Sequence, residues 1–177
     1  SNTANITTTG TTALTYCTSQ GNSTADEKIG KVAFGSINNT STGSSGYENY
    51  TAISTSASRG TAYIITITPS WTSTVYSEGY SVWIDYNQNG LFTDNGEEVW
   101  TNSATTISPV SGSFTIPATA TIGATTMRVS MKYSGIPTSC ESFPYGQVED
   151  YTVTITGGSA DTTAPSAPTA LAGSRTT

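Results

Sequence analysis

The chain of 177 residues has a formal net charge of −6, contains no histidine and carries charged residues at only 10% of its positions. Without histidine, the Ser-His-Asp and Cys-His catalytic arrangements are excluded, and six Lys and Arg residues are too few for a surface that binds nucleic acid. The length fits one domain with tails, and the low charge with ten tyrosines is typical of an extracellular β-rich protein.

The first residues are polar and show no clear hydrophobic period, so we expect a linker or a first edge strand over residues 1–15. The folded domain is predicted to span residues 16–156, with Cys17 and Cys140 near its two ends. In an oxidising compartment a disulfide between them would tie these ends together and, in the chain-entropy model, add roughly 4–5 kcal/mol of stability. The alternative is a pair of buried free thiols.

Apolar patterns predict several short strands in this domain. A short apolar run fits a strand between residues 29 and 37, and the nearly continuous run at 62–68 is typical of a strand buried on both faces. Alternating apolar and polar residues predict strands at 79–85, 127–133 and 151–155, and a shorter strand precedes Pro117. No window shows amphipathic helical spacing. The pattern therefore predicts an all-β protein, an antiparallel β-sandwich of jelly-roll-like form.

The strongest chemical signal lies in residues 83–99, W-I-D-Y-N-Q-N-G-L-F-T-D-N-G-E-E-V. Asp85, Asn87 and Asn89 occupy alternate positions, and Gly90 follows where the backbone must bend sharply. Calcium takes six to eight oxygen ligands at about 2.3–2.6 Å, and a D-x-N-x-N-G loop supplies several of them. The further predicted donors are the Leu91 carbonyl, Asp94, Glu97 and Glu98. We therefore expect a calcium loop between strands; the alternative is an Asn-Gly hairpin turn with solvated acids.

Aromatic side chains are candidates for stacking on sugar rings. Trp71 falls in a predicted loop and Trp100 lies just beyond the acidic segment, and with Tyr145 they form the predicted ligand-binding set. Packing is the alternative for each, and it is the stronger interpretation of Trp83. A glycosidase with paired carboxylates is formally possible. Because the acids crowd into one loop, however, we predict no catalytic activity.

After Ile155 the composition changes to Gly, Ser, Thr, Ala and Pro, which predicts a flexible linker over residues 157–177. The stretch D-T-T-A-P-S-A-P-T-A-L within it resembles the start of a fibronectin type III domain. We therefore expect the folded part to be one module of a longer, multidomain protein.

Three motifs coincide in the folded part: Y-C at residues 16–17, the acidic stretch at 83–99, and G-Q-V-E-D-Y-T-V-T-I at 146–155. Together they resemble the GEVED domain, a β-sandwich accessory module of secreted multidomain proteins of Bacteroidota and related bacteria. The resemblance spans about residues 16–156, and Gln147 stands where the family motif has its first glutamate.

The resemblance implies a secreted or cell-surface module that accompanies peptidase, glycoside hydrolase or adhesin-like regions. It also suggests that Glu149 and Asp150 lie close to the cation loop, as ligands or as acceptors that hold it. Alternation along a strand sends their side chains to opposite faces, so we expect one of them to reach the site. The alternative is a strand-entry turn with two solvated acids.

Two functions fit these expectations. The first is a non-catalytic, calcium-binding module that binds carbohydrate, with neutral polysaccharides as the default ligands because a negative surface repels anionic ones unless calcium bridges them. The second is a structural or adhesive spacer that presents neighbouring domains and contacts protein. We expect no nucleic-acid partner and, without a run of about eighteen apolar residues, no membrane span.

Overall fold

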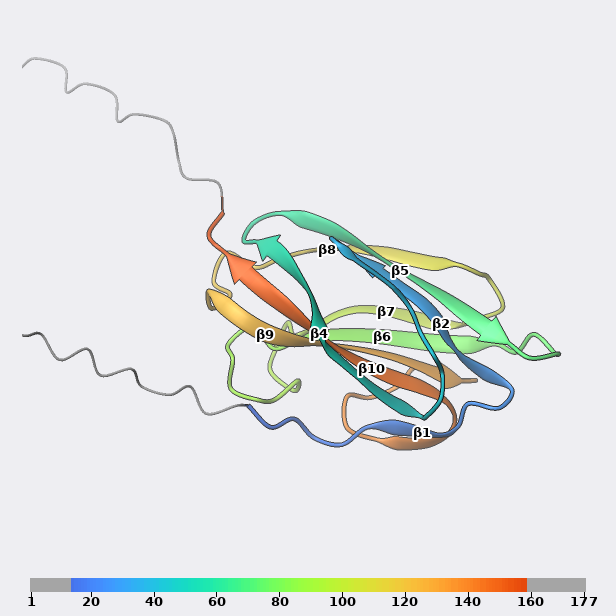
Figure 1. The fold of residues 1–177 in the computed structure, drawn as a ribbon. Helices are drawn as coiled ribbons and strands as arrows, with labels where there is room; N and C mark the ends of the chain where they lie inside the picture. The colour runs from blue at the N-terminus through green and yellow to red at the C-terminus, as the bar shows by residue number, and fades with distance from the viewer. Residues whose placement is uncertain (1–13, 159–177) are drawn as a thin grey trace, which may run out of the picture.

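The computed structural model describes residues 14–158, which form ten strands in two facing sheets (Figure 1). The strands are β1 (Gln20–Ser23), β2 (Glu27–Phe34), β3 (Ile37–Thr40), β4 (Tyr47–Ser58), β5 (Ala62–Trp71), β6 (Glu78–Ile84), β7 (Glu98–Thr105), β8 (Val110–Thr115), β9 (Gly123–Tyr133) and β10 (Ser142–Thr156). The predicted all-β sandwich is confirmed. Nearly all of the first predicted linker, and most of the second with its fibronectin-like stretch, lie outside the described residues.

The larger sheet has the order β1-β10-β9-β6-β7, and β4 also pairs with β10. One edge of β10 pairs antiparallel with β9, whereas its other edge pairs in parallel with β1 and then with β4 (Figure 1). The smaller sheet has the order β3-β2-β5-β8 and is antiparallel throughout. The predicted antiparallel sandwich therefore holds except along this one edge of β10. No helix in the described range is long and apolar enough to cross a membrane.

The hydrophobic core fills the space between the sheets because alternate residues of each strand point inward. β2 and β5 contribute from the smaller sheet, and β6, β9 and β10 contribute from the larger one. The fully buried members from these five strands are Ile29, Val32, Ile65, Ile67, Tyr80, Val82, Ile84, Met127, Val129, Met131, Tyr151, Val153 and Ile155.

The structure corrects one expectation about burial. The run at 62–68 forms β5, but it is buried on one face only: Ile65 and Ile67 are inaccessible, whereas Ile64 is 64% exposed. In contrast, all seven residues of β6 are buried. Its outer face is covered because the loop before β10 lies over it, as the hydrogen bond from the Ser81 hydroxyl to the Pro137 carbonyl shows.

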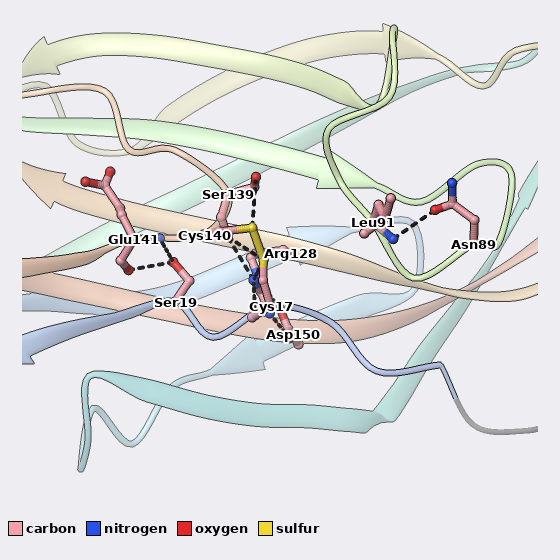
Figure 2. Close-up of a disulfide and its surroundings, with 9 residues drawn as sticks. All are labelled: Cys17, Ser19, Asn89, Leu91, Arg128, Ser139, Cys140, Glu141 and Asp150. Atoms are coloured by element: carbon pink, nitrogen blue, oxygen red, sulfur yellow. Dashed lines mark hydrogen bonds and ion pairs between the residues drawn. A yellow bond between two sulfur atoms is a disulfide. The ribbon is translucent and has the colours of Figure 1, made fainter.

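The predicted disulfide between Cys17 and Cys140 is present, with the two Cα atoms 5.5 Å apart (Figure 2). It joins the segment before β1 to the loop before β10. Beneath it, the buried Arg128 guanidinium forms two hydrogen bonds of 2.8 Å with the Asp150 carboxylate. It also donates to the carbonyls of Cys17 and Ser139. The disulfide and this ion pair together hold the N-terminal segment on the outer face of the larger sheet.

Candidate metal centre

The acidic loop, residues 85–97, begins where β6 ends and leads into β7. Asp85 is fully buried, and its carboxylate accepts hydrogen bonds from the Tyr16 hydroxyl at 2.8 Å and from the backbone N–H groups of Gly90 and Asn89 at 2.9 and 3.2 Å. Gly90 has a φ of +85°, a conformation that favours glycine. The chain thus folds back around Asp85 and directs backbone donors at it.

Asn87 and Asn89 meet Asp94 on the exposed side of this loop. Both amide nitrogens donate to Oδ2 of Asp94, at 2.9 and 2.7 Å, and these hydrogen bonds lower the pKa of the Asp94 carboxyl. The Oδ1 of Asn89 accepts from the backbone N–H of Leu91 at 2.9 Å (Figure 2). Rotation of either amide by 180° would place an oxygen where its nitrogen now lies.

Glu97 closes the loop from its buried side and is 2% exposed. Its Oε1 accepts from the backbone N–H groups of Tyr86 and Asn87, at 2.9 and 3.3 Å. Its Oε2 has no hydrogen-bond partner within residues 14–158. Burial raises the pKa of Glu97. A buried carboxylate oxygen without a donor is costly, and a cation would supply the missing partner.

The loop therefore assembles five of the predicted donors, Asp85, Asn87, Asn89, Asp94 and Glu97, in one continuous network. Carboxylate, amide and carbonyl oxygens are the ligands that calcium takes. Within residues 14–158, no group of three or more Asp, Glu, His and Cys side chains is close enough to hold a metal on its own. The loop reaches the ligand number of calcium only if amide and carbonyl oxygens complete the set, with Leu91 as the predicted carbonyl donor.

The other three predicted metal ligands lie in different surroundings. Glu98 is exposed at the start of β7, where it pairs with Trp83. Glu149 is fully buried on the core side of β10 and accepts from the Tyr151 hydroxyl at 2.6 Å, and burial raises its pKa to about 7. Asp150 lies on the opposite side, paired with Arg128. The two acids thus point to opposite faces, neither is solvated, and both bond to protein groups outside the loop.

Asp150 is nevertheless connected to the acidic loop by a series of side-chain contacts. The Arg128 guanidinium lies 4.9 Å from the centre of the Phe92 ring, and Tyr16, which donates to Asp85, stacks on Phe92 at 4.7 Å between ring centroids. Sequence reasoning missed these supporting residues. Their one available signal is that Tyr16 directly precedes Cys17, so the disulfide brings it to this face.

Of the predicted ligand-binding aromatics, Trp71 and Tyr145 lie near the same end of the sandwich, and Trp100 lies apart from them on β7. Trp100 is half-buried against the core and covers Gly112, where an added Cβ would lie 1.8 Å from the indole nitrogen. Packing therefore accounts for Trp100. Trp71, at the end of β5, donates to the Glu78 carboxylate at 3.4 Å. Tyr145 is 44% exposed and meets Tyr133 edge to face.

Among known protein families, the GEVED domain model matches residues 79–154. The match runs from the start of β6 into β10 and includes the whole acidic loop and the G-Q-V-E-D segment. No match to the chain is found among curated proteins. The resemblance identified from the sequence is confirmed over residues 79–154, the range that the GEVED domain model matches.

Proposed function

We propose that this domain is a non-catalytic accessory module of a secreted or cell-surface protein, which binds calcium in the acidic loop and binds a polysaccharide. The observation that carries the calcium part is the convergence of five oxygen-bearing side chains around the loop, with a buried Glu97 oxygen that has no donor among residues 14–158. The disulfide is compatible with an oxidising, extracellular compartment.

Calcium would be held by Asp85, Asn87, Asn89, the Leu91 carbonyl, Asp94 and Glu97. It would offset the repulsion among the three carboxylates and would stabilise the folded state by mass action. Because Asp85 also accepts from Tyr16, ordering of the loop is linked to the N-terminal segment beside the disulfide. The cation would thus stiffen one end of the sandwich.

Polysaccharide binding is supported by exposed aromatic residues on a rigid scaffold. Tyr133 and Tyr145 are each 44% exposed at the ends of long strands. A rigid platform avoids the cost of ordering side chains on binding, about 0.5–1.5 kcal/mol for each one immobilised. The sequence has no histidine for a Ser-His-Asp or Cys-His arrangement, so we assign binding without turnover.

Thermal unfolding with calcium and with excess chelator tests the metal part. We expect chelation to lower the melting temperature of the wild-type chain, and Asp85→Ala to abolish that response. Glu98→Gln is the matched control, since Glu98 is an exposed acid next to the same loop, and it should respond like the wild type. An unchanged melting temperature after exhaustive chelation would contradict the calcium assignment.

Affinity electrophoresis through neutral and anionic polysaccharides, with and without chelator, tests the binding part. Retardation by at least one polysaccharide, without change in its chain length, is the expected result. If no polysaccharide retards the chain while a protein partner binds tightly, the domain is an adhesive spacer instead.

A further inference from the structure

A cleft lies at the end of the sandwich opposite the acidic loop. It has a volume of about 200 Å³ and is lined by Asp26, Glu27, Tyr76, Tyr133 and Tyr145. Tyr133 and Tyr145 come from β9 and β10 of the larger sheet, Glu27 from the start of β2 in the smaller sheet, and Tyr76 from the loop before β6. The cleft is therefore the open mouth between the two sheets.

The three tyrosines form a corner and not a flat platform. Tyr76 and Tyr133 have ring centroids 5.7 Å apart, Tyr133 and Tyr145 have centroids 6.2 Å apart, and both pairs are inclined at 86°. Rings at right angles present both faces and edges to the cleft. An aromatic face carries negative electrostatic potential and attracts a cation as well as the C–H face of a sugar.

Two buried carboxylates lie behind these rings. Glu27 lines the cleft and is 3% exposed, and Glu78 is fully buried at the start of β6. Glu78 receives one long hydrogen bond from Trp71, and its Oε2 has no partner within residues 14–158. Burial, and then the charge of Glu27, raise the pKa of Glu78 to about 7. Burial also raises the pKa of Glu27. Glu78 is thus the acid that lacks donors among residues 14–158.

No described basic side chain compensates these acids. Lys28 donates to the Thr42 carbonyl at 3.3 Å, and Lys132 bonds to the Glu141 carboxylate at 2.8 Å. The salt bridges found in the described part of the chain are Arg128–Asp150 and Lys132–Glu141. Asp26, Glu27 and Glu78 also do not form a group close enough to hold a metal. The described basic residues therefore supply no cation to the carboxylates of the cleft.

We propose that the cleft binds a sugar unit bearing a protonated amino group, so that the polysaccharide of the proposed function is rich in amino sugars. This inference rests on that function. The sugar ring would stack in the tyrosine corner, and its ammonium group would donate to the Glu27 carboxylate with Glu78 behind it. A neutral or N-acetylated sugar would make the same ring contacts but would leave the Glu27 carboxylate uncompensated.

The test is calorimetric titration of the full chain at pH 6 with a β-1,4-glucosamine oligosaccharide and with its N-acetylated counterpart of equal length. Nα-acetyl-lysine methylamide supplies an amine without a sugar ring. We expect the glucosamine oligosaccharide to bind at least about tenfold more tightly than either other probe, because a hydrogen bond to a charged group is the stronger kind.

Two variants locate the site. Glu27→Gln keeps the side-chain shape and removes the charge, so it should weaken binding of the glucosamine oligosaccharide about tenfold, to near the level of the N-acetylated probe. Tyr145→Ala should weaken both oligosaccharides, because both lose the stacked ring. Glu98→Gln, at the far end of the sandwich, is the matched control and should bind like the wild type.

Each contrary outcome has a distinct meaning. Equal binding of the acetylated and free-amine oligosaccharides, or no effect of Glu27→Gln, overturns the amino-sugar inference and leaves polysaccharide binding intact. Binding of the lysine amide alone overturns it in favour of a peptide cation. If no oligosaccharide binds and no polysaccharide retards the chain, the proposed function fails as well.

Discussion

The two ends of β6 carry acids of equal burial but different surroundings. Glu78 begins the strand and Asp85 directly follows it, and neither is accessible to solvent. Within the described part of the chain, the Asp85 carboxylate accepts three hydrogen bonds of 2.8–3.2 Å, whereas Glu78 receives a single one of 3.4 Å. Asp85 lies seven positions after Glu78, and a strand rises by roughly 3.3 Å per residue, so the two acids lie at opposite ends of β6. The difference arises from what surrounds each carboxylate.

At Asp85 the donors come from the chain that follows immediately, because Gly90 lets the loop turn its N–H groups back. At Glu78 the neighbouring groups come from other strands, and the like charge of Glu27 raises its pKa further. The first arrangement stabilises a negative charge, and the second disfavours it. One end therefore suits a hard metal ion, and the other suits an organic cation or a proton.

Asp150 differs from both of these acids because a buried guanidinium, that of Arg128, pairs with its carboxylate. Of the acids compared, we therefore expect its removal to cost the most stability. Asp150→Ala leaves Arg128 buried and unpaired, so the free energy of unfolding should fall by about 3–5 kcal/mol. In the matched control, Glu141→Ala removes a side chain that is 23% exposed and pairs with Lys132, and it should cost at most about 1 kcal/mol. Urea unfolding measures both. Equal losses would show that Arg128 is solvated.

The raised pKa of Glu78, and that of Glu149, make stability depend on pH. In each case burial raises the pKa from 4.5 to about 7. The folded state therefore holds protons that the unfolded state releases, so stability is full below about pH 4.5 and falls as pH rises through 7. The loss should be about 2–3 kcal/mol for each group. Urea unfolding at pH 5 and pH 8 measures it.

Glu78→Gln and Glu149→Gln should each reduce the loss of unfolding free energy between pH 5 and pH 8. Glu48 is the control of opposite sign: burial raises its pKa, but hydrogen bonds from hydroxyl and backbone groups outweigh burial and lower it to about 2. Its contribution is present above about pH 4.5 and is lost only at lower pH, so Glu48→Gln should leave the slope between pH 5 and 8 unchanged. A wild-type stability that rises over this range would contradict the burial of both acids.

The acidic loop was predictable because its information is local. Asp85, Asn87, Asn89 and Gly90 follow one another at fixed spacing, so the chain itself brings their groups together. Alternation also predicted the strands that became β6 and β9. In contrast, β4 (Tyr47–Ser58) is mostly polar and half exposed, so its parallel pairing with β10 left no periodic signal.

The cleft and the buried ion pair could not be predicted for a related reason. Glu27 and Glu78 are 51 positions apart and meet only because two sheets face each other at one end. Arg128 occupies an outward position of β9 that is ordinarily solvated. It is buried because the disulfide holds the segment at Cys17 over it. Such contacts depend on the assembled sandwich and not on a pattern within one strand.

Glu97→Gln tests whether the unpartnered oxygen matters to the metal. In saturating calcium the variant should be about 1.4–2.7 kcal/mol less stable than the wild type, corresponding to a tenfold to hundredfold weaker affinity. Under chelation the difference should vanish or change sign, because a neutral amide is easier to bury than a carboxylate. Thermal and urea unfolding in both conditions measure it. An equal loss in both would mean that Glu97 is purely structural.

Glu98→Gln should have the smallest effect. Glu98 is exposed at the start of β7, so the change in stability should stay within about 0.5 kcal/mol with or without calcium. If it weakened the calcium response as much as Glu97→Gln, Glu98 would be a ligand, and the loop would rearrange on binding.

Calorimetric titration of calcium into the metal-free chain tests directly whether the acidic loop is a calcium site. We predict one calcium ion per chain, a rise in melting temperature that follows the same saturation, and loss of both in Asp85→Ala. Glu97→Gln, which keeps the side-chain shape, should retain the fold and bind about tenfold or more weakly. No heat of binding, together with an unchanged melting temperature, would show that the acidic loop is a hydrogen-bonded turn and not a calcium site.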